Sequence, residues 1–310
     1  MVNGIFVLGP TAAGKTGLAV DLARRLAARD MAAEIISADS RQVYRGLDIG
    51  SGKDLAEYGS IPHHLIDITA LPAEYSVFDF QRDFYAAWND VRRRGAMPIT
   101  CGGTGLYLDS VLRGYGFVRV PPNPALRAEL AGLSMEDLTE RLLRLRSAPH
   151  NRTDLEERPR LVRAIEIAEY GRENPIPNGE GGPPALEPLI LGVRFERAEL
   201  RRRIAERLDA RLGQGLVEEV AGLHAGGIEW ERLERLGLEY RYTAELLQGK
   251  IDSVAEYRDR LYTAICQFAK RQETWFRGME RKGVRVLWVD RGERESAWNR
   301  VRSELEGEAE

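Results

Sequence analysis

The chain has 310 residues, 43% of them hydrophobic, so it can form one large domain or two of ordinary size with a real core. It carries 45 Lys and Arg residues against 48 Asp and Glu residues, and at a net charge of −3 any nucleic acid must be bound by a local basic patch. The cysteines and histidines lack zinc-ligand spacing, and no apolar stretch is long enough to span a membrane. We therefore expect a globular, monomeric protein of the reducing cytoplasm, without a structural metal site or a membrane contact.

The first element in chain order is a buried parallel strand at residues 5–8, followed by a helix near residues 17–26. Between them lies Gly9-Pro10-Thr11-Ala12-Ala13-Gly14-Lys15-Thr16, which fits the phosphate-binding pattern GxxxxGK[ST]. In such a loop the backbone N–H groups and the helix N-terminus bind anions, Lys15 reaches the terminal phosphates, and the Thr16 hydroxyl ligates Mg²⁺. The sequence thus predicts Mg²⁺ as cofactor and a diphosphate site formed by Gly9, Thr11, Ala12, Ala13, Gly14, Lys15 and Thr16.

Further strands are expected at residues 34–40, 64–68 and 97–101. A helix at 76–94 begins at Ser76, with Asp79 placed to complete a capping box. A second glycine turn, Gly102-Gly103-Thr104-Gly105, opens a helix at 106–112. The alternation of strands and helices predicts an α/β fold of the P-loop NTPase type, with a doubly wound, mainly parallel sheet.

Residues 119–187 differ in composition from what precedes them. They contain helical stretches at 125–146 and 154–169 and then a loop rich in Gly and Pro. We interpret this segment as a small helical domain inserted into a core formed by residues 1–118 and 188–300. The rest of the core is expected to contain strands at 189–195 and 284–289 and helices at 198–213, 216–224, 239–247 and 253–277, before a charged tail at 301–310.

Three segments besides the P-loop carry chemistry: Asp39-Ser40-Arg41-Gln42-Val43-Tyr44, the second glycine turn, and Lys270-Arg271-Gln272-Glu273-Thr274-Trp275-Phe276-Arg277. In order and spacing, from Gly9 to Asp290, they resemble the tRNA dimethylallyltransferases, also called tRNA isopentenyltransferases. The resemblance implies transfer of the dimethylallyl group of dimethylallyl diphosphate to the exocyclic amine of the adenosine 3′ of the anticodon. It also implies a P-loop core with a mobile helical insertion that contacts the anticodon stem-loop. The chain departs from the family pattern at Gly50-Ser51-Gly52-Lys53-Asp54, where GTAKP is usual.

The resemblance points to Asp39, Thr104 and Lys15 as catalytic residues. Asp39 would act as the base that takes the amine proton, with a magnesium ligand as the alternative role. Thr104 would hold the diphosphate or orient the base, and its alternative role is a helix cap. Lys15 would stabilise the departing diphosphate.

Contacts with tRNA are expected from three places. Asp39, Ser40, Arg41 and Gln42 would hold the flipped adenine, although Gln42 could also be a solvated loop residue. Arg158, Arg160 and Arg163 would meet phosphates, or else form a solvated helix face paired with Glu156, Glu157 and Glu166. Arg271 would bind diphosphate or RNA backbone, whereas Trp275 and Phe276 favour core positions. Tyr44 and Tyr107 would either line the prenyl pocket or pack structurally.

Three other functions compete with this one. A small-metabolite kinase would use the insertion as a lid and its arginines as a phosphate clamp. A transferase acting on free AMP would need no insertion that binds an anticodon. A catalytically silent RNA-binding protein would not need Lys15, Thr16 and Asp39 together.

Overall fold

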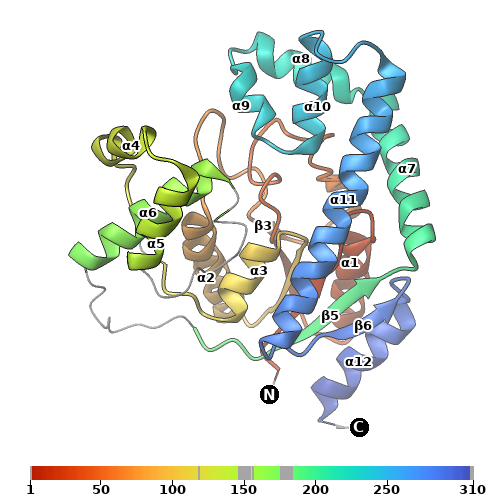
Figure 1. The fold of residues 1–310 in the computed structure, drawn as a ribbon. Coiled ribbons are helices and arrows are strands. Elements are labelled where there is room, and N and C mark those ends of the chain that lie inside the picture. The colour runs from red at the N-terminus through yellow and green to blue at the C-terminus, as the bar shows by residue number, and fades with distance from the viewer. Residues whose placement is uncertain (1, 118, 146–154, 156, 175–183, 308–310) are drawn as a thin grey trace. The chain divides into compact units, whose positions relative to one another are not determined.

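The computed structural model describes all residues except 1, 118, 146–154, 156, 175–183 and 308–310. It divides the chain into two compact units (Figure 1). The core unit combines Met1–Tyr115 with Pro184–Glu310, and the helical unit is Gly116–Pro183.

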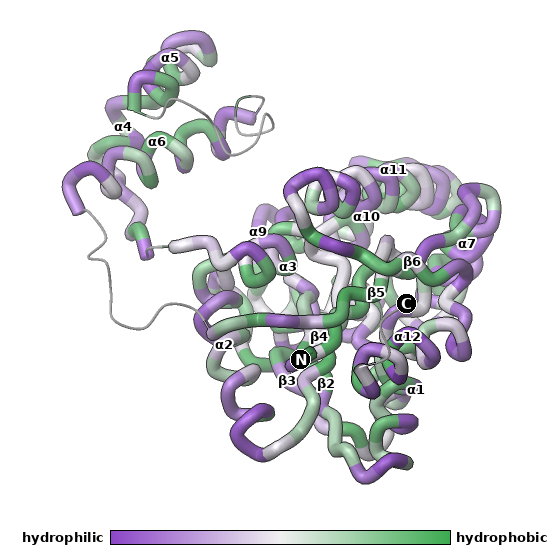
Figure 2. Tube along the Cα trace, turned by 90° about the horizontal axis from the view of Figure 1, so that it is seen from below, coloured by the Kyte–Doolittle hydropathy of each residue, from purple (hydrophilic) through white to green (hydrophobic). Residues whose placement is uncertain are grey.

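The core unit is built on a sheet of six parallel strands in the order β3-β2-β4-β1-β5-β6. Central β1 places Ile5 opposite Ile99 of β4 and Leu189 of β5. Strands enclosed on both faces explain the short apolar runs in the sequence, such as that of central β1, which is buried along its whole length, and the middle of the sheet is largely hydrophobic in Figure 2. The strands are β1 (Gly4–Leu8), β2 (Ala33–Ser37), β3 (His63–His64), β4 (Met97–Gly102), β5 (Pro188–Arg194) and β6 (Leu287–Asp290).

Helices cover both faces of the sheet, so the predicted doubly wound α/β fold is confirmed. Alternate residues of β1 point to opposite faces: Ile5 and Val7 join one buried cluster, and Phe6 and Leu8 join the other. The first cluster includes side chains of α1 (Lys15–Ala27) and α12 (Arg294–Glu306). The second includes side chains of α2 (Val77–Arg93), α3 (Gly105–Leu112) and α11 (Val254–Arg281).

Four further helices pack beyond the carboxyl ends of the strands: α7 (Arg197–Gly213), α8 (Leu216–Ala225), α9 (Trp230–Glu234) and α10 (Leu238–Leu247). A short 3₁₀ helix, η1, spans Leu55–Glu57. Buried residues of α7 and α11 form one cluster with Ala12 of the P-loop. This cluster brings late segments of the chain against the first loop.

The helical unit consists of α4 (Pro124–Ala131), α5 (Met135–Leu145) and α6 (Arg158–Glu173). Its own small core confirms the helical insertion in the predicted fold, and contains Leu126, Leu130, Leu138, Leu142, Leu161, Ile165 and Ala168. The single helix expected at 125–146 is wrong, because α4 ends at Gly132 and Ser134 caps a new helix by exchanging hydrogen bonds with Asp137.

Three predicted boundaries also need correction. The strand expected at 64–68 ends at His64, because Leu65 and Asp67 adopt positive φ angles of 62° and 55°. The core resumes before residue 188, because Asn3 exchanges hydrogen bonds with Ala185 and Glu187. The core also continues past residue 300, because Val301 of α12 is buried.

Candidate active site

The P-loop has the backbone that its glycines allow. Gly14 precedes α1 in the left-handed conformation with φ 76°, which glycine adopts without strain. Gly9 packs so closely on β5 that a Cβ there would lie 2.7 Å from the carbonyl oxygen of Val193. The Lys15 ammonium folds back over the loop and donates to the Pro10 carbonyl at 2.8 Å. The loop is therefore closed around the N-terminus of α1, where an anion is favoured.

Lys15 is a partly buried cation at the N-terminus of α1, where an anion would be favoured. Burial lowers its pKa to about 8; the guanidinium of Arg207 adds to this effect and the carboxylate of Asp39 opposes it. Among the described residues, Lys15 forms no ion pair with a carboxylate. A bound diphosphate would supply the missing negative charge.

The second glycine turn lies directly against the P-loop. A Cβ on Gly103 would lie 3.3 Å from the Gly9 carbonyl oxygen and 3.4 Å from Lys15 Nζ. A Cβ on Gly102 would lie 2.3 Å from the Ala38 carbonyl oxygen, so this turn also abuts the end of β2. The two glycine turns and the Asp39 segment therefore lie side by side at the carboxyl ends of β1, β4 and β2, and this region, with the pocket described below, is called the cleft.

Thr104 and Asp39 are fixed by hydrogen bonds to neighbouring backbone. Thr104 precedes α3, but its side chain does not cap that helix; Oγ1 accepts the Ser40 N–H at 3.1 Å instead. The helix-cap alternative for Thr104 is therefore wrong. Asp39 Oδ1 accepts the Arg41 N–H at 2.8 Å, which leaves Oδ2 for another partner. Both the base and the magnesium-ligand roles remain open for Asp39.

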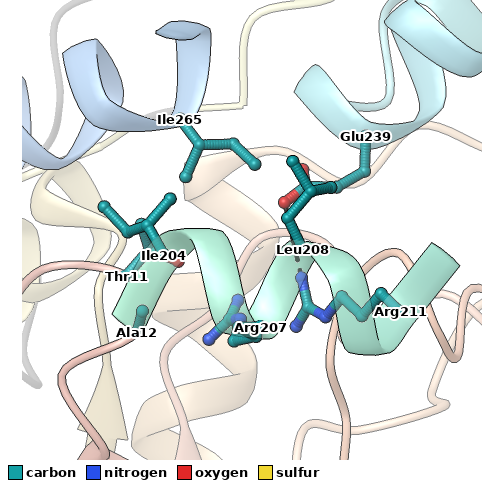
Figure 3. A pocket seen from close by; sticks show the side chains of 8 residues that line it. All are labelled: Thr11, Ala12, Ile204, Arg207, Leu208, Arg211, Glu239 and Ile265. Atoms are coloured by element: carbon teal, nitrogen blue, oxygen red, sulfur yellow. Dashed lines mark hydrogen bonds and ion pairs between the residues drawn. The ribbon is translucent and has the colours of Figure 1, made fainter. Parts of the chain in front are cut away.

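Sequence reasoning missed two arginines of α7 that line a pocket beside the P-loop with Thr11 and Ala12 (Figure 3). Burial lowers the pKa of Arg207 to about 10, and the nearby Arg211 contributes. No ion pair of Arg207 occurs in the described part of the chain. Arg211 is buried, contacts Glu239 at 3.4 Å, and keeps one buried nitrogen for which the described residues supply no hydrogen-bond partner. The sequence signal was available, because Arg211 continues the buried repeat of Leu200, Ile204 and Leu208 on α7.

Gln42 and two tyrosines have structural partners. Gln42 is buried, accepts the Ser37 hydroxyl at 2.8 Å and donates to the Gly52 carbonyl at 3.1 Å. The solvated alternative for Gln42 is wrong, and its bonded amide disfavours the adenine-reading role. The buried Tyr44 hydroxyl accepts the Tyr75 N–H, and Tyr107 stacks on Phe80 with ring centroids 4.0 Å apart. These contacts match the packing roles.

The segment that departs from the family pattern is rigidly held. Lys53 is buried and pairs with Asp48 and Asp67. Glu219 accepts the N–H groups of Asp48, Ile49 and Gly50. Gly52 is the residue that fits, because a Cβ there would lie 1.7 Å from Arg211 Nη2. The Gly52 of this chain therefore makes room for Arg211 beside the cleft.

Helix α11 contributes both buried and exposed groups. Arg271 is exposed, with its guanidinium 5.9 Å from the ring centroid of Phe268. Trp275 packs on Gly105, and Phe276 is fully buried in the core, as the sequence favoured. Gln272 is buried between the two glycine turns and bonds to both of them.

The arginines of the helical unit are largely occupied. Arg158 donates to the Leu130, Ala131 and Leu133 carbonyls at the end of α4. Arg163 pairs with Glu166 at 2.9 Å and donates to the Val120 carbonyl. Arg160 pairs with Glu157 at 3.0 Å in an exposed contact. Arg160 is paired on an exposed face, whereas the Glu166 partner of Arg163 is buried, and Glu156 lies outside the described residues. That these arginines meet phosphates stays a prediction.

Glu166 is the centre of the charge network in that unit. Burial opposes its ionisation, but hydrogen bonds from Arg127, the Asn123 N–H and Arg163 outweigh it and lower the pKa of Glu166 to about 2. Arg127 donates to both carboxylate oxygens, at 2.7 and 3.0 Å. This carboxylate is therefore saturated with donors.

The described residues contain no group of three His, Cys, Asp or Glu side chains arranged to hold a metal ion. Burial raises the pKa of Cys101 to about 11, so the thiol beside the P-loop is neutral at physiological pH. In the described part of the chain, no helix is both long and apolar enough to cross a bilayer.

Comparison with known proteins places this geometry in context. The model of the IPP transferase family matches residues 42–279. The chain is 55% identical over 291 residues to tRNA dimethylallyltransferase 2 of Treponema denticola, covering 93% of this chain and 95% of that one. It is also 55% identical over 289 residues to the protein of that name in Trichlorobacter lovleyi, covering 93% and 92%.

Solved structures agree with the sequence relatives. The full-length tRNA isopentenylpyrophosphate transferase of Bacillus halodurans superimposes with a TM-score of 0.71 at 30% identity, covering 99% of this chain and 98% of that one. A eukaryotic dimethylallyltransferase acting on tRNA gives a TM-score of 0.74 at 23% identity, covering 96% and 76%, and supports the fold alone.

Proposed function

The chain belongs to the IPP transferase family and is a prenyl-transferring enzyme that modifies tRNA, and we propose that its donor is dimethylallyl diphosphate. The acceptor in this proposal is the exocyclic amine of the adenosine 3′ of the anticodon, and diphosphate is released. The observation that carries the proposal is the meeting of the P-loop, the second glycine turn and the Asp39 segment, where the carboxylate of Asp39 raises the pKa of both Lys15 and Arg207 against the effect of burial. The family assignment favours this reaction over the kinase, AMP-transferase and silent RNA-binding alternatives.

The donor diphosphate would bind at the N-terminus of α1. The N–H groups of Ala12 and of residues 14–16 would bind its oxygens. The N–H of Thr11 already donates to Gln272 at 2.8 Å, and that of Ala13 to the Pro10 carbonyl at 3.3 Å. Of the predicted diphosphate residues, Thr11 would therefore contribute through its hydroxyl. Lys15 and Arg207 would stabilise the negative charge that builds on the leaving group as the carbon–oxygen bond breaks.

The acceptor adenine would enter from the side of Asp39. An exocyclic amine is a weak nucleophile because its lone pair is delocalised into the ring, so attack needs a proton acceptor. The free Oδ2 of Asp39 would take that proton while Oδ1 stays bonded to the Arg41 N–H. The bond from Ser40 to Thr104 fixes the segment that carries Asp39 against the second glycine turn.

Mg²⁺ fits this site as an ion recruited with the substrate. It prefers to keep several waters and to bind through substrate phosphates plus one or two protein groups. The Thr16 hydroxyl at the start of α1 is the protein group that would hold it. Once bound, the ion would neutralise charge on the leaving diphosphate.

Contacts with tRNA outside the cleft would come from exposed cations. Arg271 on α11 and Arg160 on α6 are the predicted residues whose side chains remain exposed. Arg41 would contact the RNA near the flipped base. Because one chain supplies the residues that would bind both the diphosphate donor and the adenine acceptor, we propose that the protein acts as a monomer. We also propose that it acts in the cytoplasm, where tRNA is found.

The test is transfer of label from dimethylallyl diphosphate, with Mg²⁺, into unmodified tRNA, with AMP and ATP assayed in parallel. Label in the adenosine beside the anticodon is the expected result. Label only in AMP would move the enzyme to the nucleotide-modifying branch. Consumption of ATP without any label transfer would support the kinase alternative.

A further inference from the structure

Gln272 forms a bridge inside the cleft that the sequence motifs did not predict. It is 7% exposed on α11, and its carboxamide uses both ends. Oε1 accepts the Thr11 N–H of the P-loop at 2.8 Å, and Nε2 donates to the Gly103 carbonyl of the second glycine turn at 2.8 Å. Only one orientation of the amide satisfies both bonds, because an N–H faces one end and a carbonyl faces the other.

The second glycine turn is shaped to receive this bridge. A Cβ on Gly103 would lie 2.6 Å from Gln272 Nε2, closer than real Cβ atoms approach a neighbour. The same Cβ would make tight contacts of 3.3 and 3.4 Å with the Gly9 oxygen and Lys15 Nζ. Glycine at position 103 therefore lets three elements meet: the P-loop, the second turn and α11.

The two turns that Gln272 connects would bind different substrates in the proposed reaction. Thr11 belongs to the loop that would bind the leaving diphosphate. Gly103 precedes Thr104, whose hydroxyl holds the segment that carries Asp39. The spacing between these turns sets the distance from the breaking carbon–oxygen bond to the attacking amine, and an error of about 1 Å in such a distance can cost about 10²-fold in rate.

We propose that Gln272 is a positioning residue that fixes this spacing, an inference that rests on the proposed prenyl transfer. It touches neither the diphosphate nor the adenine. It acts by holding two backbone turns at the separation that transfer requires. Removal should therefore lower kcat while the KM values for dimethylallyl diphosphate and tRNA stay close to those of the wild type.

The test is a double-mutant cycle on prenyl transfer. Gln272→Met keeps the length of the side chain and removes both hydrogen bonds. Gly103→Ala displaces the same amide from the other side and keeps Gln272 itself. Its Cβ also contacts the Gly9 oxygen and Lys15 Nζ, so the KM for dimethylallyl diphosphate is measured for each variant. Each single variant should lower kcat about 10- to 100-fold when it is assayed well below its own unfolding temperature, because the groups left without a partner also lower thermal stability. The double variant should be no slower than the worse single one, because the bridge can be lost only once.

Gln248→Met is the matched control. Gln248, the C-cap residue of α10, also makes two side-chain hydrogen bonds, which it donates to Glu234 and to the Ala244 carbonyl, and its loss should leave kcat unchanged. Equal kcat in wild type and Gln272→Met, or fully additive effects in the cycle, would refute the positioning role of Gln272. Neither result would count against the proposed prenyl transfer. An inactive wild type would instead refute the proposed function.

Discussion

The core cleft and the helical unit use their cations in opposite ways. In the described part of the cleft, Lys15 and Arg207 have no ion pair with a carboxylate. In the helical unit, Arg127 and Arg163 converge on the buried carboxylate of Glu166. A partly buried cation without an anionic partner is costly, so Lys15 and Arg207 mark a place where an external anion would be favoured. Pairing marks a place where charge supports the fold.

The three arginines at the start of α6 in the helical unit differ in how firmly they are bonded. Arg158, Arg160 and Arg163 look alike in the sequence, but only Arg160 is exposed in a weak surface pair. An exposed pair contributes about 0–1 kcal/mol and can be exchanged for a contact with phosphate. A cation bonded to a buried carboxylate or to helix carbonyls cannot leave so readily.

The largest effect should come from Asp39→Asn, which tests whether the carboxylate of Asp39 in the cleft acts on the substrate. Asparagine keeps the oxygen that accepts the Arg41 N–H but cannot take the amine proton. We expect kcat to fall about 10²- to 10⁴-fold while affinity for diphosphate and tRNA is retained. Single-turnover transfer and a separate binding assay measure the two quantities.

Asp209→Asn provides the control for that experiment, because it removes an exposed carboxylate of α7 that pairs with Arg258. Its kcat should equal that of the wild type. Near-normal turnover in Asp39→Asn would exclude Asp39 as the base and leave the magnesium-ligand role.

The next largest effect should come from raising the pH above the pKa of Lys15. The pKa of Lys15 is lowered to about 8, so the free enzyme loses this positive charge as pH rises through 8. Affinity for inorganic diphosphate should then fall by up to about tenfold per pH unit above that value. Calorimetric titration between pH 7 and 9 measures it. Lys15→Met supplies the baseline for the titration of diphosphate itself, and an equally steep fall in that variant would assign the pH dependence elsewhere.

Local signals allowed much of the fold to be predicted from the sequence. The apolar strands, the GxxxxGK[ST] loop and the capping box of Ser76 with Asp79 each involve neighbouring residues, and each is present in the structure. The capping pair of Ser134 and Asp137 is an equally local signal, and it begins α5. The end of β3 could not be anticipated in the same way, because it depends on backbone angles at Leu65 and Asp67.

The rest of the site depends on contacts between distant segments. Gln272 reaches Thr11 across 261 residues of sequence, and Arg203 reaches the Ala12 carbonyl across 191. No period or spacing rule links such positions. The same holds for Arg127 and Glu166, which pair only after α4 and α6 have packed. Which arginines are bonded within the protein and which could contact RNA therefore cannot be read from the sequence.

A smaller effect should follow from Arg163→Ala, which tests the paired side of the comparison. The buried Glu166 carboxylate would lose one donor, and the Val120 carbonyl would lose its partner. We expect the free energy of unfolding of the helical unit to fall by about 1–3 kcal/mol. Hydrogen exchange of α6 measures this local stability. Arg144→Ala, which breaks an exposed pair with Glu140, should change it by less than about 1 kcal/mol.

The smallest effect, and the one that separates the two uses of arginine most directly, should come from Arg160→Ala. Its pair with Glu157 leaves the two side chains 54% and 57% exposed, so its loss should not alter stability measurably. If Arg160 neutralises a phosphate of tRNA, the slope of log affinity against log salt should become shallower by about 0.7–0.9. Arg163→Ala, measured under conditions where α6 remains folded, should keep the wild-type slope, because that cation is already neutralised by Glu166. An unchanged slope for Arg160→Ala together with a shallower one for Arg163→Ala would mean that RNA displaces the buried pair, and pairing would then no longer distinguish structural arginines from binding ones.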